Sequence, residues 1–387
     1  MRVVYRVLRR APMALVVAAC GSDPVAAPAV APNLDVASSG EVGANALAQF
    51  EVTVLPLLPG GTWSEATAIN DGGSIVGYGN VTGGAVHAFV YRNGTIQDLG
   101  NRKGYLNSRA YGINVNGEVV GAASTTTRPR STTAVIWSSS GQISALPGTD
   151  TVRASTARAI NRSGVVVGSF RNANGDLHPA RWTGGVLEDY LPFMQPGLSG
   201  EARAVNDAGV AVGFGDFYSP FSLYQSARWD AQKNPTFIPP LNNGTIYADS
   251  SELYDINNSG DWVGWSDYPI SGVPQGVHYT WLDGELYPPQ GAAVGAHEVA
   301  LSDRKRLVGT LRSSTNRLRA YTNTTYMFPN GLGELLPIVP YAESKATDVN
   351  ACGRVVGWVS PRGATNRRAA LWTRWARGTQ GRVYPCD

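Results

Sequence analysis

The amino-acid sequence predicts an all-β fold, a seven-bladed β-propeller of four-stranded blades that follows a signal peptide and a flexible tether. Three observations support this prediction. A pattern of about 45 residues recurs seven times after residue 50, glycine and proline are abundant at 45 and 24 residues, and no long stretch has apolar residues at helical spacing. Because a ring of repeats grows without enlarging one core, 387 residues do not require several separate domains.

The first twenty residues are typical of an exported protein. Met1–Arg10 is basic, and Ala11–Ala19 is apolar but too short to cross a hydrocarbon core, which needs about 20 residues. We therefore predict a signal peptide over residues 1–19. Its end, Val17-Ala18-Ala19-Cys20, resembles the lipobox of bacterial lipoproteins, which implies that Cys20 carries a lipid. An ordinary secretion signal is the alternative.

Residues 20–49 are rich in Ala, Pro, Ser and Val without clear periodicity, so we predict a flexible tether spanning about 30 Å. It would hold the propeller, residues 50–387, away from a membrane that the lipid anchors. The predicted location is thus the cell envelope, at the outer membrane or cell surface, or the extracellular space. Without the four arginines of the signal peptide, 28 basic residues face 29 acidic ones, which gives no electrostatic reason to expect nucleic acid as a partner.

The clearest part of the repeat is a strand of small residues, an Asn-x-x-Gly turn and a second strand ending in Val-Gly. In six of the seven copies, the final Gly of this unit lies seven residues after the Asn. In the remaining copy, the sixth along the chain, Ser302 replaces the Asn. Successive copies are 44 to 51 residues apart. The seven copies are Ala66–Gly77, Ala110–Gly121, Ala157–Gly168, Ala202–Gly213, Leu253–Gly264, Glu298–Gly309 and Ala346–Gly357.

The turn residues have a structural explanation. An Asn side chain can cap backbone N–H groups of the turn, and Gly three residues later can adopt positive φ without steric cost. Lys305 occupies this Gly position in the sixth copy, so we predict strain and the least regular blade there. A calcium loop needs more carboxylates than the single acid that Asp71, Asp207 or Asp303 supplies to its turn, so we predict no metal or other cofactor.

Side-chain size orders the strands within a blade. Small residues such as Ala68, Gly112 and Ala159 precede the turn, which suits the crowded axis, although Asp255 and Asp348 break this rule. This strand is therefore predicted to be innermost, with tight turns on one face of the ring and the longer loops on the other. The third strand of each copy carries an aromatic residue that we expect in the core. These residues are Tyr91, Trp137, Trp182, Trp229, Trp281, Tyr321 and Trp372.

The repeat resembles the bacterial extracellular HAF repeat family, whose naming tripeptide is His87-Ala88-Phe89 here. The resemblance covers residues 51 to 387 and implies export and a repeat fold, and it implies no catalytic residues. His87, His178 and His278 enter the third strand of alternate copies, so we expect a repeated structural role for them, and the same for His297. The sequence contains no HExxH, GxSxG, P-loop or CxxC motif, so no catalytic residue is predicted and an enzyme is the less favoured class.

Two questions stay open at this stage. Cys352 and Cys386 form an even pair suited to an oxidising compartment, but Cys352 lies in an inner turn and Cys386 at the end of an outer strand. Val52–Leu57 and Arg382–Cys386 both look like fourth strands, so one strand is surplus. Either the N-terminal strand closes the ring within the last blade, or one of the two is an edge addition.

The leading functional hypothesis is a binding module whose loops, on one face of the propeller, take a glycan or a protein. Aromatic residues gather in the loops around the fourth and fifth copies, and aromatic faces beside acids are common in sugar sites and protein interfaces. Alternatively these side chains only pack the loops. A polysaccharide hydrolase or lyase, which needs two carboxylates or a His with a Tyr, and a purely structural envelope protein are the other candidates. The candidate ligand-binding residues are Phe217, Tyr218, Phe221, Tyr224, Tyr247, Trp265 and Tyr268.

Overall fold

In the part of the chain that the computed structural model describes, all regular elements are β-strands, and no helix there is long and apolar enough to cross a membrane. The predicted signal peptide, Cys20 and the tether lie outside that part. The described residues are 50–125, 132–148, 154–172, 174–189, 199–217, 223–238, 250–270, 273–283, 285–287, 297–312, 317–323, 334–338, 340–361 and 366–374.

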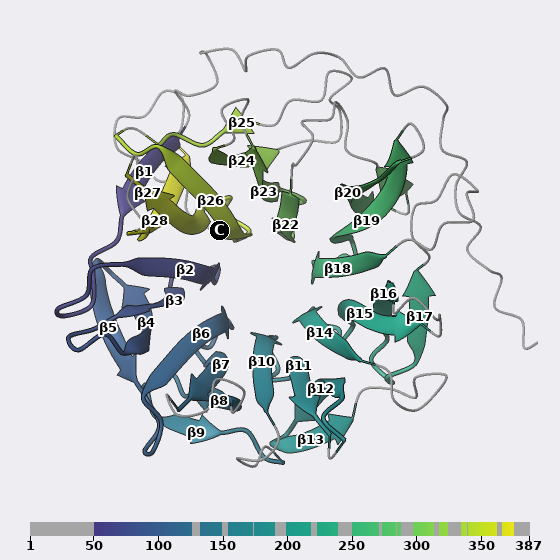
Figure 1. Ribbon diagram of the computed structural model, residues 1–387, viewed down its shortest axis with the longest axis horizontal. Helices are drawn as coiled ribbons and strands as arrows, with labels where there is room; N and C mark the ends of the chain where they lie inside the picture. Colours follow the sequence, from purple (N-terminus) through teal and green to yellow (C-terminus); the bar gives the residue numbers. More distant parts are fainter. Residues whose placement is uncertain are drawn as a thin grey trace, which may run out of the picture. The chain divides into compact units, whose positions relative to one another are not determined.

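Seven antiparallel sheets of four strands surround a central axis, which confirms the predicted propeller of residues 50 onward (Figure 1). In each of the first six blades the chain runs from the innermost to the outermost strand. Blade one contains β2 (Ser64–Ile69), β3 (Ile75–Asn80), β4 (Val86–Arg92) and β5 (Thr95–Gly100). Blade two contains β6 (Asn107–Ile113), β7 (Val119–Ser124), β8 (Thr132–Trp137) and β9 (Ile143–Ala145). Blade three contains β10 (Ser155–Ile160), β11 (Val166–Arg171), β12 (Leu177–Thr183) and β13 (Val186–Asp189).

The second half of the ring follows the same order. Blade four contains β14 (Gly200–Val205), β15 (Ala211–Phe217), β16 (Leu223–Trp229) and β17 (Pro235–Ile238). Blade five contains β18 (Ser251–Ile256), β19 (Trp262–Ile270), β20 (Val273–Leu282) and β21 (Glu285–Tyr287). Blade six contains β22 (His297–Leu301), β23 (Leu307–Arg312), β24 (Leu318–Asn323) and β25 (Glu334–Leu335). Blade seven contains β26 (Glu343–Val349), β27 (Val355–Ser360) and β28 (Arg368–Arg374), completed by β1 (Phe50–Val54).

The N-terminal strand closes the ring within the last blade, which was one of the two alternatives for the surplus strand. β1 pairs antiparallel with β28, from Phe50 opposite Arg374 to Val54 opposite Ala370. It is thus the outermost strand of blade seven, joined to a sheet whose other strands come from the far end of the sequence. The other candidate fourth strand, Arg382–Cys386, lies outside the described residues. Cys352, in the turn between β26 and β27, is disulfide-bonded.

The predicted turn chemistry is confirmed, and the strained copy is where we expected it. The turn glycines have φ between +74° and +88°, and Lys305 has φ +58°. A non-glycine residue in this region costs on the order of 1 kcal/mol. Blade six also ends in β25, a strand of two residues. Lys305 forms ion pairs with Asp261 and Asp283, which offset part of its strain.

A β-bulge between the first and second strands recurs in every blade, and sequence reasoning missed it. Each bulge lies three residues before the turn Asn and leaves one residue of the inner strand unpaired. It also pushes an inner-strand carbonyl against the Gly of Val-Gly, where an added Cβ would lie 1.9 to 2.3 Å from that oxygen in six blades. The repeated Gly therefore makes room for the bulge. The bulged residues are Thr67, Tyr111, Arg158, Arg203, Tyr254, Val299 and Thr347.

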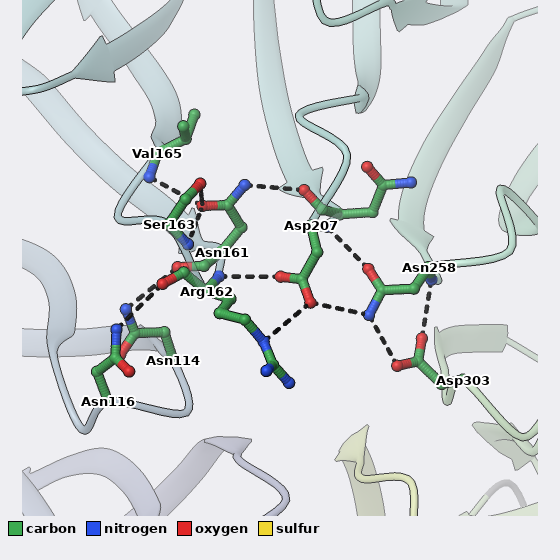
Figure 2. Close-up of polar contacts among 10 residues, drawn as sticks. Asn114, Asn116, Asn161, Arg162, Ser163, Val165, Asp207, Asn258 and Asp303 are labelled. Atoms are coloured by element: carbon green, nitrogen blue, oxygen red, sulfur yellow. Dashed lines mark hydrogen bonds and ion pairs between the residues drawn. The ribbon is translucent and has the colours of Figure 1, made fainter.

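The turn asparagines form a belt of hydrogen bonds around the axis (Figure 2). Within each blade the Oδ1 atom caps its own turn, as Asn161 does for Val165 N at 2.9 Å. The Nδ2 atom donates to the backbone carbonyl of the same position in the next blade, over 2.9 to 3.3 Å. Ser302 has no amide to donate, so the belt is open between blades six and seven. The donor–acceptor pairs are Asn70–Asn114, Asn114–Asn161, Asn161–Asn206, Asn206–Asn257, Asn257–Ser302 and Asn350–Asn70.

The hydrophobic core lies between adjacent blades. Trp137, Trp182, Trp229 and Trp372 are at most 1% exposed, which confirms the predicted role of the third-strand aromatics. Three of these indoles also donate a hydrogen bond to a carbonyl of the preceding blade, for example Trp137 Nε1 to Leu99 O at 3.1 Å. Tyr91 and Trp281 are partly buried at the edge of their clusters. Packing between the blades thus stabilises the ring, and the inward-facing side chains of the inner strands are not needed for it.

Candidate functional site

The inner strands line a cavity of about 380 Å³ at the axis, which we call the axial cavity. In these strands buried and partly exposed residues alternate, as in β2, where Glu65 and Thr67 are partly exposed and their neighbours are buried. The bulge gives the unpaired residue this inward position, and the residue two before it shares its face. The cavity is lined by Thr67, Tyr111, Arg158, Glu201, Arg203 and Thr347.

A chain of alternating charges crosses blades three, four and five. Arg158 Nε donates to Glu201 Oε1 at 2.8 Å, and Arg203 lies 3.8 Å from the other Glu201 oxygen. Arg203 Nη2 in turn lies 2.8 Å from Glu252 Oε2. Glu201 is only 6% exposed and also accepts a hydrogen bond from Ser169 Oγ at 3.0 Å. Burial alone would lower the pKa of Arg158, but the charge and the hydrogen bond of Glu201 raise it above its ordinary value.

Aromatic rings hold the cationic side chains in place. The Arg158 guanidinium lies 5.1 Å from the ring centre of Tyr111, and Arg203 lies between Phe214 and Tyr254 at 4.8 and 4.9 Å. Burial, with the charge of Glu252, raises the pKa of Tyr254 to about 12. A cation over an aromatic face gains about 0.5–2 kcal/mol, which fixes its orientation before any ligand arrives.

A second group of the same kind continues from blade one into blade two. Tyr78 donates to Glu65 Oε2 at 2.9 Å, and burial and this carboxylate raise the pKa of Tyr78. Arg109 lies over the Tyr78 ring at 5.3 Å, and Tyr78 packs edge-on against Tyr111 at 6.4 Å. Arg367 pairs with Glu65 at 2.5 Å. Aromatic contacts therefore connect Arg109 to Arg158 along the inner wall of the ring. We call the space inside this wall, which includes the axial cavity, the axial channel.

The two aspartates that break the small-residue rule clamp neighbouring blades. Asp255 accepts from Leu301 N of blade six at 2.8 Å, and Asp348 accepts from Ile69 N of blade one at 2.8 Å. Each also accepts from the next residue of its own strand. Burial raises the pKa of Asp255 to about 8, with a further contribution from the Asp348 charge, and raises that of Asp348 to about 6. Their role is structural, because both oxygens of each are engaged by backbone.

The acids of the Asn-x-x-Gly turns have a structural role, because each binds the backbone of a turn in a neighbouring blade; Figure 2 shows Asp207 and Asp303. Asp207 accepts from Arg162 N at 2.9 Å, and Asp303 accepts from Asn258 N at 2.8 Å. Asp71 does the same for Ala351 N at 2.9 Å. No group of three or more metal-ligating side chains occurs among the described residues.

Two of the seven predicted ligand residues lie beside this channel. Trp265 is partly exposed, faces Glu252 in the β18–β19 register and hydrogen-bonds the Tyr254 side chain. Tyr224 is 39% exposed and packs edge-on against Phe214 at 5.0 Å, which in turn contacts Arg203. For the other five, the side chains lie outside the described part of the chain. These five are Phe217, Tyr218, Phe221, Tyr247 and Tyr268.

Sequence reasoning missed the axial residues. The position three before the turn Asn is polar, charged or aromatic in six copies, within a strand of otherwise small residues. That contrast was the available signal. The two described histidines contact neighbouring side chains, but with different partners: His87 Nδ1 bonds Asp98 at 2.9 Å, and His178 stacks on Phe170. The side chains of His278 and His297 lie outside the description.

Comparison with protein-family models and with curated proteins finds no match. Among solved structures, the chain is similar to oligogalacturonate lyase from Vibrio parahaemolyticus, with a TM-score of 0.58 at 11% identity over 84% of this chain and 96% of that chain. It is also similar to TolB from Acinetobacter baumannii, with a TM-score of 0.41 at 13% identity over 84% and 80% of the two chains. For the SapL1 lectin in complex with alpha methyl fucoside the TM-score is 0.38, at 10% identity over 83% and 96%. The likeness to the lyase, at this low identity, shows the fold alone.

Proposed function

We propose that this protein is an exported, lipid-anchored binding module of the cell envelope, and that its propeller takes a saccharide at the axial cavity. The observation that carries the proposal is the Arg158–Glu201–Arg203–Glu252 chain, backed by aromatic rings, along a cavity of about 380 Å³. A cavity of this size suits a small ligand or one end of a chain. The resemblance to the HAF repeat family and the lipobox support export and anchoring at Cys20.

The chemistry of the cavity suits sugars. A saccharide presents hydroxyl groups, which both donate and accept, together with apolar C–H faces. Guanidinium groups donate and carboxylates accept in fixed planar geometry, while Tyr and Trp rings supply apolar faces with a polar edge. Arg158 and Glu201 are already oriented by their mutual bond and by Tyr111, so binding them costs little conformational entropy.

The proposal is tested by binding of the protein, purified as the cell processes it, to an array of glycans and cell-wall polymers. We expect at least one specific ligand, whose affinity falls about tenfold or more in Trp265→Ala, the loss of roughly one aromatic contact. Val186→Ala is the matched control, because Val186 is 61% exposed on the outermost strand of blade three. Absence of any glycan ligand, or equal effects of the two variants, would reject a saccharide site at the channel.

A polysaccharide hydrolase or lyase is the second candidate, because two carboxylates meet at one point of the channel. Glu201 and Glu252 both contact Arg203. A glycosidase needs one of its two carboxyl groups to hold a proton as general acid, whereas both of these accept contacts from arginine. This pairing favours binding over hydrolysis. Release of new reducing or unsaturated ends from the array ligand, abolished in Glu252→Gln, would instead support the enzyme.

A further inference from the structure

The axial channel carries more positive than negative charge among the side chains that the structure describes. Three of its acids are paired: Glu65 with Arg367, Glu201 with Arg158, and Glu252 with Arg203. A fourth acid, Glu343, lies two residues before Lys345 on β26. Arg109 and Lys345 contribute two further positive charges. Neither of them forms an ion pair within the described part of the chain.

Backbone geometry places both of these cations on the channel wall. Arg109 is two residues before Tyr111 on β6, and Lys345 is two residues before Thr347 on β26. Tyr111 and Thr347 line the axial cavity, and residues two apart on a strand share a face. Arg109 and Lys345 belong to blades two and seven, which flank blade one, so they lie on either side of Glu65 of blade one.

The donors of Arg158 are only partly used. Its Nε binds Glu201, and within the described residues its two terminal nitrogens make no hydrogen bond. A guanidinium has five N–H donors, so four remain on the two terminal nitrogens, and one from each nitrogen forms an edge whose spacing matches a carboxylate. The ring of Tyr111 and the carboxylate of Glu201 fix the plane of that edge. An arginine held in this way is suited to bidentate recognition of an anion rather than to general charge attraction.

We propose that the ligand is a carboxylated saccharide, one built of hexuronic acid residues. Its carboxylate binds the terminal nitrogens of Arg158, and Arg109 and Lys345 compensate the charge of the same or an adjacent sugar. The sugar ring lies against the aromatic residues that hold these cations. This inference rests on the proposed function and specifies its ligand class.

The test compares hexuronate oligomers prepared from alginate with the same oligomers after reduction of their carboxyl groups to alcohols. Calorimetric titration of the whole processed protein gives both affinities. We expect the acidic oligomers to bind about tenfold more tightly or better, since a charge-assisted hydrogen bond is roughly twice as strong as a neutral one. Arg109→Gln and Lys345→Gln should each lower the affinity for the acidic oligomers several-fold and leave that for the reduced oligomers unchanged.

Arg162→Gln is the matched control. It removes the same charge from the turn after β10, where the Arg162 side chain is 67% exposed and pairs with Asp207. Arg109, Lys345 and Arg162 make no contact with the Arg158–Glu201 pair among the described contacts, so these variants leave that pair intact. Thermal melting checks the fold. An effect of Arg162→Gln as large as that of Arg109→Gln would mean non-specific attraction and would overturn the inference.

The outcomes separate the two proposals. Equal affinity for acidic and reduced oligomers overturns the carboxylate assignment while the saccharide site stands. Binding of neutral glycans from the array but of neither alginate-derived oligomer has the same meaning. Binding of no glycan at all rejects the saccharide site, and the ligand class with it.

Discussion

The asparagine belt gives a prediction whose magnitude follows from the structure. In Asn161→Ser the hydroxyl can still accept from the turn, as Ser302 Oγ does from Arg306 N at 3.0 Å, but the donation to Asn206 O is lost. That carbonyl still accepts a hydrogen bond from Gly209 N at 3.0 Å, so the substitution does not leave it without a donor. One buried hydrogen bond of this kind contributes about 1 kcal/mol, and we expect the free energy of unfolding to fall by that amount.

The natural exception allows the reverse experiment. Ser302→Asn restores the residue that the other six blades carry and offers a donor to Asn350 O, which accepts only Gly353 N, at 2.9 Å, among the described groups. We expect it to raise the free energy of unfolding by about 1 kcal/mol. Asn161→Ala should cost more, about 2–4 kcal/mol, because the buried Val165 N then loses its acceptor as well.

Equilibrium unfolding in urea measures these changes as shifts of the midpoint at constant slope. Asn116→Ser is the control, since Asn116 Nδ2 also donates to the next blade, at Arg162 O over 3.0 Å, but from an exposed position. It should change stability by less than about 0.5 kcal/mol. If Asn161→Ser and Ser302→Asn both leave the midpoint unchanged, the belt contributes nothing to stability and the reasoning is wrong.

Three further predictions concern the strained turn, the repeated glycine and the buried acids. Lys305→Gly should change stability little at low salt, where strain relief offsets lost ion pairs, and raise it by about 1 kcal/mol in 1 M NaCl, where those pairs are screened. Gly121→Ala should cost about 3 kcal/mol or more in urea unfolding, because its Cβ would lie 1.9 Å from Arg109 O; a cost below about 1 kcal/mol would contradict the bulge argument. The raised pKa of Asp255, about 8, means that the folded state binds the proton more tightly, so stability falls from pH 4 to pH 8. Asp255→Asn should weaken that fall, leaving the part that Asp348 causes between pH 4 and 6, as urea midpoints at pH 5 and 8 would show.

The fold was predictable because each blade repeats the same local requirements. Seven in-register copies of a turn that needs Asn and Gly fix the number of hairpins, and the aromatic of the third strand fixes what packs between blades. The closure by β1 was not decidable, because pairing between residue 50 and residue 374 depends on tertiary geometry rather than on any local pattern. Nor was the belt, since the same Asn can cap its own turn without reaching the next blade.

The candidate site was predicted only at its edge. Loop aromatics drew attention to Trp265 and Tyr224, which lie beside the channel, but not to Arg158 or Arg203. In a regular strand the position three before the turn Asn would be one more alternating residue. The bulge makes it an unpaired residue aimed at the axis, and a bulge is not visible in spacing alone.

The same geometry explains why the axial position varies more than the positions that hold the ring. Ala157 and Gly168 are constrained because the bulge brings two backbones together, and Asn161 is constrained because it spans two blades. Arg158, between them, meets neither requirement and faces open space in the cavity. A repeat of this kind constrains the residues of the inner strand that hold the ring, and it leaves the bulged residue and the residue two before it free to change. These positions converge on the axis, so the binding chemistry of the propeller is set there, by residues other than those that hold the ring.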